Sequence, residues 1–445
     1  MAGKSETPAG ELFPVAPIPF CLASILAVCS HILFVREPEF PMPVTLTVIA
    51  GPEAGRELHI QGRDTFLAGR AAECHFRPGY DDPYIAARHF LIDVRLPRCR
   101  LIDLNTKSGT KVNGQKVAEK DLVNGDELRA GQTVLRVTFP PDVPPGKGAP
   151  ATAEMPAMTD MPAVPKTAPQ IEGYEPENEI GRGALGKVYR GKQTSDDSRV
   201  AIRTIRPAPQ ATPEDINRFL FAMHKLESLR HPLIVEVLGS GLAGNRPYIV
   251  SEFVIGPSAH QFVAERGPVA VRAAVLMMIQ ALEGLAHAHS EGFVHGNVKP
   301  SNLLIGKYGD KRRVKVAEFG LARAFDESNL GGRTLLGEVP GSLAFVAPEQ
   351  LSHVREAKPA ADQYSAAATL YYLLTAKHIY DLPEGAVPAI ARILSAEPLP
   401  IMKRREDIPE PLAKTIHKAL SREPAARFAD IDAFRQALID GPGGS

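Results

Sequence analysis

The sequence predicts two domains of different fold class, an all-β sandwich followed by an α+β domain with two lobes. Short alternating apolar runs with tight turns fill residues 44–139, and a Pro- and Ala-rich stretch follows them. After Tyr174 the chain shows short β-like runs and then long helical periodicity. At 445 residues the chain is long enough for each domain to bury a core of its own.

The predicted sandwich spans residues 42–140. Its first and last strands are VTLTV, from Val44, and TVLRVTF, up to Phe139, and both alternate apolar with polar residues. The runs HFLIDV and CRLIDL are further β-like segments between them. Asn113-Gly114 and Asn124-Gly125 mark tight turns. Many short strands joined in this way are typical of a β-sandwich.

Nine prolines between Pro140 and Pro169 separate the two domains. Residues 141–170 therefore cannot bury a core, and we predict a semi-extended linker there. The second domain is predicted at 171–440, with a tail at 441–445. Its β-like runs are GKVYRG, RVAIRTI and PYIVSEF, and its helix-like runs are VRAAVLMMIQALEGLAHAHS, LYYLLTA and DIDAFRQALI.

The first 41 residues fit neither domain. Residues 19–35 are largely apolar, but 17 residues is the lower limit for crossing a bilayer. A secretory signal needs a basic front end, and only Lys4 supplies positive charge there. Three interpretations stay open: an unstructured or mistranslated leader before Met42, a membrane anchor through residues 19–35, and a signal peptide.

The charge balance and the cysteine spacing bear on the expected partners and on the cellular compartment. Lys plus Arg equals Asp plus Glu, at 51 each, so no net field favours nucleic acid or an acidic membrane. The four cysteines form no CxxC pair and no metal-ligand spacing, which is typical of free thiols in a reducing cytosol. They are Cys21, Cys29, Cys74 and Cys99. We expect a cytoplasmic protein with no nucleic-acid partner, or one anchored to a membrane by residues 19–35.

A glycine-rich run, GRGALGKVYRG, lies between two predicted strands and contains Gly181, Gly183 and Gly186. Glycines there let the backbone close over phosphate groups without a β-carbon clash. Alone this is a weak indication, because a dinucleotide-binding turn has the same spacing. VAIR, LRHPLIV, VHGNVKPSN, AEFG and APEQ follow in that order. The whole series resembles the protein kinase family, nearest to its bacterial serine/threonine kinases.

The resemblance implies transfer of phosphate from ATP with the help of Mg²⁺, but the residues for this chemistry are changed. The lysine that grips the α- and β-phosphates falls at Arg203, whose planar guanidinium seldom fits a lysine slot. The helical glutamate that would pair with that lysine falls at Ala222. Glu227 is five residues further on and off that helical face, so we do not expect it to replace the missing partner.

The catalytic loop and the metal-binding motif are changed too. The family's HRD becomes HGN, and Asn297 stands where an aspartate would accept the substrate's proton. Gly296 removes the arginine that would bind a phosphorylated activation loop, whereas Lys299 and Asn302 match the pattern. DFG becomes EFG, and the extra methylene of Glu318 displaces the carboxylate that would hold Mg²⁺.

The positions that build the kinase fold are kept. Val188, Ala201 and Leu304 match the residues that sandwich adenine, and the hinge falls at Glu252 and Val254. Ordinary core packing also accounts for these residue types. Other matches are the regulatory-spine residues Leu226, Val237, His295 and Phe319, the ion pair Glu349–Arg427, and Asp362, which anchors the catalytic loop. A retained fold with lost chemistry predicts a pseudokinase.

In the sandwich, LAGR, IAARH, DLNTKSGTKVNG and NGDELRAG resemble the forkhead-associated (FHA) domain, a reader of phosphothreonine peptides. Arg70 matches the family's phosphate-binding arginine, His89 the histidine that braces the recognition loop, and Asn113 the second asparagine. The family's SRxH, however, has Ala86-Ala87 here, and the asparagine of NGT is Ser108. Several charge-assisted hydrogen bonds to phosphate are thereby lost. A sandwich that binds proteins without reading phosphate is the alternative.

Together these features predict a non-catalytic signalling scaffold with weak or absent ATP binding and a weakened Mg²⁺ site at Asn302 and Glu318. Its expected partners are proteins, phosphothreonine-containing ones among them. The alternative is an enzyme, a weak serine/threonine kinase that uses Arg203 and Glu318 unconventionally. Asn297 distinguishes the two, because an enzyme needs a proton acceptor and no other stands beside it in the sequence.

Overall fold

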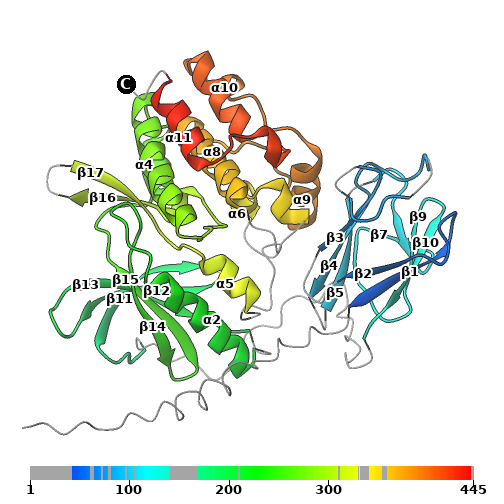
Figure 1. The fold of residues 1–445 in the computed structure, drawn as a ribbon, viewed down its shortest axis with the longest axis horizontal. Helices are drawn as coiled ribbons and strands as arrows, with labels where there is room; N and C mark the ends of the chain where they lie inside the picture. The colour runs from blue at the N-terminus through cyan, green and yellow to red at the C-terminus, as the bar shows by residue number, and fades with distance from the viewer. Residues whose placement is uncertain are drawn as a thin grey trace, which may run out of the picture. The chain divides into compact units, whose positions relative to one another are not determined.

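The computed structural model describes residues 43–441, apart from short gaps and one long one. The gaps are 61–64, 72–73, 79–81, 96–97, 105, 141–168, 184, 209–210, 309–310, 329, 331–339 and 353–357. Within the described residues the chain forms a β-sandwich and a two-lobed α+β domain, as the sequence predicts (Figure 1). The leader, the apolar residues 19–35 and most of the predicted linker lie outside the described residues.

The sandwich consists of two antiparallel sheets. The first has the order β2-β1-β10-β9-β6-β7 and the second β3-β4-β5-β8. Their bounds are β1 (Val44–Ala50), β2 (Glu57–Ile60), β3 (Thr65–Ala68), β4 (Phe90–Arg95), β5 (Arg98–Asp103), β6 (Thr110–Val112), β7 (Gln115–Val117), β8 (Glu119–Asp121), β9 (Glu127–Ala130) and β10 (Thr133–Thr138). Alternate residues of β1 and β4, such as Leu46, Val48, Phe90 and Ile92, point inward and form the core between the sheets.

The small lobe of the second domain is a five-stranded sheet, in the order β11-β12-β13-β15-β14, with helix α2 packed beside it (Figure 1). The bounds are β11 (Tyr174–Gly183), β12 (Gly186–Gln193), β13 (Arg199–Ile205), α2 (Pro213–Leu226), β14 (Val237–Ala243) and β15 (Arg246–Glu252). Helix α2 starts with a capping box, in which Thr212 accepts from the Asp215 amide and Asp215 accepts from the Thr212 amide.

The large lobe is mainly helical. Its bounds are α3 (Ala259–Arg266), α4 (Val271–Ser290), η1 (Pro300–Asn302), β16 (Leu303–Tyr308), β17 (Lys311–Val316), α5 (Leu321–Glu327), α6 (Pro340–Leu343), α7 (Pro348–Ser352), α8 (Pro359–Thr375), α9 (Ala386–Ser395), η3 (Ile401–Lys403), α10 (Glu410–Ala419), η4 (Pro424–Ala426) and α11 (Ile431–Ile439). Among the described helices, α4 alone is long and apolar enough to cross a membrane. It packs against α8, α11 and β17, and its buried side chains belong to the lobe's core.

Candidate active site

The glycine-rich run forms the turn of the β11–β12 hairpin. Gly181 lies opposite Val188, and Gly183 lies opposite Gly186. On the next strand pair, Val188 lies opposite Arg203, so their side chains share one face of the sheet. Ala201 is two residues before Arg203 and faces the same way. The fold therefore brings the glycine-rich turn, two of the predicted adenine contacts and Arg203 to one surface.

Arg203 pairs with Glu318. Its Nη2 donates to Glu318 Oε1, and the two side chains are only 19% and 23% exposed. Helix α2 supplies no carboxylate to Arg203, because Ala222 occupies the expected position. Glu227 caps the end of α2, where it accepts from Ser240 Oγ at 3.1 Å and pairs with His224 at 3.0 Å. Glu227 is thus engaged at the end of α2, and the ion-pair partner of Arg203 is Glu318 rather than Glu227.

The two substitutions in this pair have complementary lengths. Arginine reaches further than lysine, and glutamate reaches further than aspartate. With no acid at Ala222, the longer cation and the longer anion meet each other. The positive charge of Arg203, expected to bind phosphates, and the negative charge of Glu318, expected to bind a metal ion, then neutralise each other in one intramolecular ion pair.

The loop around His295 is held by Asp362. The carboxylate of Asp362 accepts from the backbone amides of His295, at 2.8 Å, and Gly296, at 2.7 Å. Burial lowers the pKa of His295, so its imidazole is neutral near pH 7. Its Nε2 lies 3.0 Å from the Ala317 carbonyl. The His295 ring contacts Phe319, with 4.6 Å between ring centroids. Phe319 and Leu226 are both buried in the hydrophobic core, and Val237 packs against it.

The remaining loop residues keep a kinase-like arrangement without its base. Asn302 is buried, and its Nδ2 donates to the Asn297 carbonyl at 3.0 Å. Lys299 Nζ donates to Ser342 Oγ at 3.4 Å. Within the described part of the chain, the side-chain amide of Asn297 makes no hydrogen bond. An uncharged amide in this place can orient a hydroxyl but cannot take its proton.

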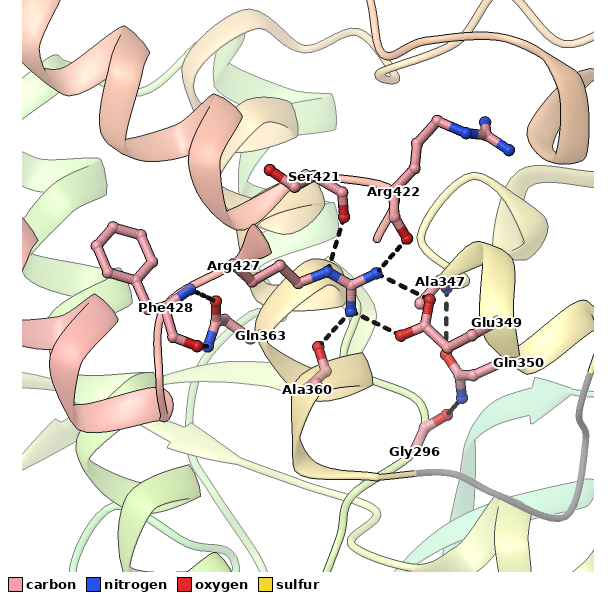
Figure 2. Close-up of polar contacts among 10 residues, drawn as sticks. All are labelled: Gly296, Ala347, Glu349, Gln350, Ala360, Gln363, Ser421, Arg422, Arg427 and Phe428. Atoms are coloured by element: carbon pink, nitrogen blue, oxygen red, sulfur yellow. Dashed lines mark hydrogen bonds and ion pairs between the residues drawn. The ribbon is translucent and has the colours of Figure 1, made fainter. Parts of the chain in front are cut away.

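A buried ion pair closes the large lobe (Figure 2). Arg427 donates to both oxygens of Glu349, at 2.6 and 2.8 Å. The Arg427 side chain is fully buried, and it also donates to the carbonyls of Ser421, Ala360 and Arg422. The sequence interpretation did not single out Gln350, which donates to the Gly296 carbonyl at 3.0 Å and so ties α7 to the catalytic loop.

In the sandwich, His89 braces the loops as the FHA resemblance implies. It is buried, its Nδ1 accepts from the Ala86 amide at 3.1 Å, and its Nε2 lies 3.4 Å from the Gly109 carbonyl. Arg70 is exposed, and its Nε donates to the Ile85 carbonyl at 2.6 Å.

Asn113 lies in the β6–β7 turn, and its side chain is engaged within the domain. Its Nδ2 donates to Asp126 at 2.6 Å, and its Oδ1 accepts from the Glu127 amide at 2.9 Å. This asparagine therefore braces a turn, and the ligand-binding role that the resemblance implies for it receives no support from these contacts.

Residues 174–439, well over half of the chain, match the family model of the protein kinase domain. The chain belongs to the protein kinase family. Residues 66–131 match the family model of the FHA domain, which generally binds phosphothreonine-containing proteins. Both resemblances inferred from the motifs are thus confirmed.

Several curated relatives are bacterial serine/threonine kinases. The serine/threonine-protein kinase PknK of Mycobacterium bovis is 34% identical over 272 residues, which cover 60% of this chain and 23% of the relative. Pkn1 of Myxococcus xanthus is 31% identical over 288 residues, which cover 62% of this chain and 41% of the relative. The chain therefore spans less than half the length of these relatives.

Solved structures show the same fold. A crystal structure of Rad53 residues 1–466 in complex with AMP-PNP aligns with a TM-score of 0.50 at 22% identity, over 91% of this chain and all of that one. A double mutant of the Mycobacterium tuberculosis PknI kinase domain aligns with a TM-score of 0.50 at 23% identity, over 62% of this chain and 98% of that one. At this identity the likeness shows the fold alone.

A kinase domain ordinarily uses ATP with Mg²⁺, and the metal-binding side of this site fits that role poorly. Glu318 Oε1 is paired with Arg203. Asn302 donates its Nδ2 to the Asn297 carbonyl, so its Oδ1, which among the described residues accepts only from Ser301 Oγ at 3.4 Å, remains the atom that could bind a metal ion. No group of three or more His, Cys, Asp or Glu side chains with metal-binding geometry occurs in the part of the chain that the structure describes. A metal ion at Glu318 would share the carboxylate with the Arg203 guanidinium, whose positive charge repels a cation.

The adenine side of the kinase domain fits better. Val188, Ala201 and Leu304 are all partly buried, and Leu304 packs against Val254. Among the described residues, no hydrogen bond is made by the Val254 backbone amide. The carboxylate of Glu252 is held by Lys315, a partner that sequence reasoning missed. These residues offer apolar side chains for adenine and an unused hinge amide.

Proposed function

We propose that this member of the protein kinase family is a pseudokinase that acts as a signalling scaffold. The observation that carries the proposal is the Arg203–Glu318 ion pair, which neutralises the two charges that phosphoryl transfer needs most. Asn297 supports it, because it leaves the site without a base. The contact between the His295 and Phe319 rings and the Glu349–Arg427 pair support a stable domain able to present a surface to partners.

One observation favours a weakly active serine/threonine kinase as a second candidate. Asp362 anchors the catalytic loop, and Lys299 contacts Ser342, as in a catalytic arrangement. A weakly active kinase requires two things. The Arg203–Glu318 pair has to open when nucleotide binds, and a water molecule has to accept the substrate's proton.

We expect the purified chain to transfer no phosphate to itself or to a basic protein substrate, with either Mg²⁺ or Mn²⁺. Loss of the base alone typically costs roughly 10²–10⁴ in rate, and the paired charges at Arg203 and Glu318 add to that loss. The measurement is transfer of the γ-phosphate from radiolabelled ATP. Transfer that is detected, and that disappears in Arg203→Ala or Lys299→Ala variants, would support the weak kinase instead.

Nucleotide binding should be weak and insensitive to metal. Saturating ATP is expected to raise the melting temperature by about 2 °C or less, because only the adenine slot contributes, and Mg²⁺ should add nothing. The variant Glu318→Gln should show a larger shift without metal, since Arg203 is then free to bind phosphate. Differential scanning fluorimetry tests both. A large shift that requires Mg²⁺ in the unchanged protein would show a working metal site.

The FHA domain should bind phosphothreonine peptides poorly. Ala86, Ala87 and Ser108 remove partners that would share the phosphate with Arg70. A phosphothreonine peptide library should therefore give no binding tighter than about 100 µM, the range of weak, few-contact association. Micromolar, phosphate-dependent binding that is lost in Arg70→Ala would contradict this expectation.

A further inference from the structure

Three basic residues stand side by side on the outer face of the sandwich. Lys111 of β6 lies directly opposite Lys116 of β7 and directly opposite Arg129 of β9. All three side chains are exposed, whereas their neighbours Val112 and Leu128 are buried. We call Lys111, Lys116 and Arg129 the basic row. Like charges directly opposite one another destabilise a sheet, so the row has a cost in the unliganded domain.

The described residues supply no counter-charge to the row. Among the residues that the structure describes, no carboxylate lies within 4.0 Å of the charged nitrogens of Lys111, Lys116 or Arg129. Glu127 is two residues from Arg129 on the same strand, but it pairs with Arg136 at 3.0 Å.

Several other basic side chains of the domain are paired. Arg100 lies 2.8 Å from Asp121, and Lys120 lies 3.4 Å from Asp126. Unlike these side chains, the basic row has no carboxylate partner among the described residues, so it can bind an external anion.

A pocket adjoins the row. It has a volume of about 390 Å³, and Lys111 and Arg129 line it together with Tyr84, Ser108 and Gly109. Ser108 Oγ donates to the Tyr84 carbonyl at 2.6 Å, which links two walls of the pocket. Tyr84 is 62% exposed and can contact a ligand. The lining therefore combines two cations with a hydroxyl and an aromatic ring.

Gly109 determines where Lys116 lies. A β-carbon at Gly109 would overlap the Lys116 side chain, and the φ angle of Gly109 is +73°. Any larger residue would be strained there and would push the ammonium group away. The absence of a β-carbon lets Lys116 pack against Gly109, which lines the pocket.

We propose that the basic row binds a short acidic segment of a protein partner, and that it does so independently of Arg70. Three neighbouring strands span about 10 Å, which suits two or three carboxylates of one extended peptide. Duplex nucleic acid usually requires roughly six to ten phosphate contacts, more than one row of three cations supplies. The inference goes beyond the proposed pseudokinase function, because it concerns only the FHA domain.

The test measures fluorescence anisotropy of labelled probes with the full chain. The probes are a Ser/Gly peptide with six glutamates, the same peptide with six glutamines, and a single-stranded oligonucleotide. The glutamate peptide should bind at low salt and weaken as salt increases. Lys111→Gln with Lys116→Gln should reduce its affinity at least about tenfold, since two charge-assisted contacts are lost. Arg70→Ala should change it less than about twofold, in line with a site that does not use Arg70.

The control variant is Lys403→Gln with Lys414→Gln. It removes the same charge from exposed lysines of the helical lobe and should bind the peptide normally. Equal binding of the glutamine peptide would overturn the proposal, as would unchanged binding by the Lys111/Lys116 variant. Oligonucleotide binding through the row, without binding of the glutamate peptide, would also overturn it.

A stability measurement separates loss of the site from loss of the fold. Lys116→Glu should abolish peptide binding yet raise the melting temperature by about 2 °C at low salt, because repulsion becomes attraction. At 0.5 M salt the difference should disappear. A lower melting temperature at low salt would show that the row is not a source of repulsion and would count against the proposal.

Discussion

Phosphotransfer is expected to appear only when five positions are changed together. The changes are Arg203→Lys, Ala222→Glu, Gly296→Arg, Asn297→Asp and Glu318→Asp. The lysine–glutamate pair positions the phosphates, the aspartate of the catalytic loop takes the proton, and the metal-binding aspartate neutralises charge, so each is idle without the others. The structure adds a reason: shortening both Arg203 and Glu318 removes the ion pair that now joins them.

Single reversions should leave the chain inactive. Asn297→Asp supplies a base, but Arg203 still pairs with Glu318. Arg203→Lys still lacks a glutamate at Ala222. Gly296→Arg carries a cost of its own, since the φ angle of Gly296 is 75°, and a side chain in that region costs roughly 1 kcal/mol or more. The five-residue variant therefore has a small stability deficit in addition to any gain in activity.

The measurement is γ-phosphate transfer to a basic protein substrate by the five-residue variant and by each single variant. The matched control adds Lys299→Ala to the five-residue variant and should abolish the activity, because Lys299 stands at a matching catalytic-loop position. Strong activity from Asn297→Asp alone would show that the other four positions support phosphoryl transfer as they are. The loss of activity would then be due to Asn297 alone.

Arg427→Ala should destabilise the kinase domain by about 3–5 kcal/mol. The side chain is fully buried, and its removal takes away the guanidinium that donates to both oxygens of Glu349. The carbonyls of Ser421 and Ala360 would also lose their donor. This is the largest stability effect that we expect from a single substitution, because one guanidinium satisfies a carboxylate and several carbonyls together.

Urea unfolding followed by circular dichroism at 222 nm measures this loss. All described helices lie in the kinase domain, so the signal reports mainly on that domain. Arg435→Ala is the control, since Arg435 pairs with an exposed carboxylate, Asp432, and should lose less than about 1 kcal/mol. A loss below about 1 kcal/mol for Arg427→Ala would mean that solvent or another cation compensates Glu349.

The sequence by itself determined the fold class and the chemical defects. Short alternating runs such as VTLTV predict strands, and the periodic run from Val271 predicts a helix. Both predictions need only the local sequence, because side-chain periodicity follows from strand and helix geometry. The absence of a base at Asn297 is likewise local, since an amide is not basic in any fold. The order of the motifs along the chain was sufficient to identify the kinase and FHA families, and the matches to the two family models confirm both.

Only the tertiary structure decided which charges meet. Arg203 and Glu318 are 115 residues apart, and nothing in the sequence joins them. The same holds for the basic row, where strand register places Lys116 and Arg129 on either side of Lys111. Electrostatic pairing depends on distances of a few ångströms, and those distances are set by register and packing rather than by separation along the chain.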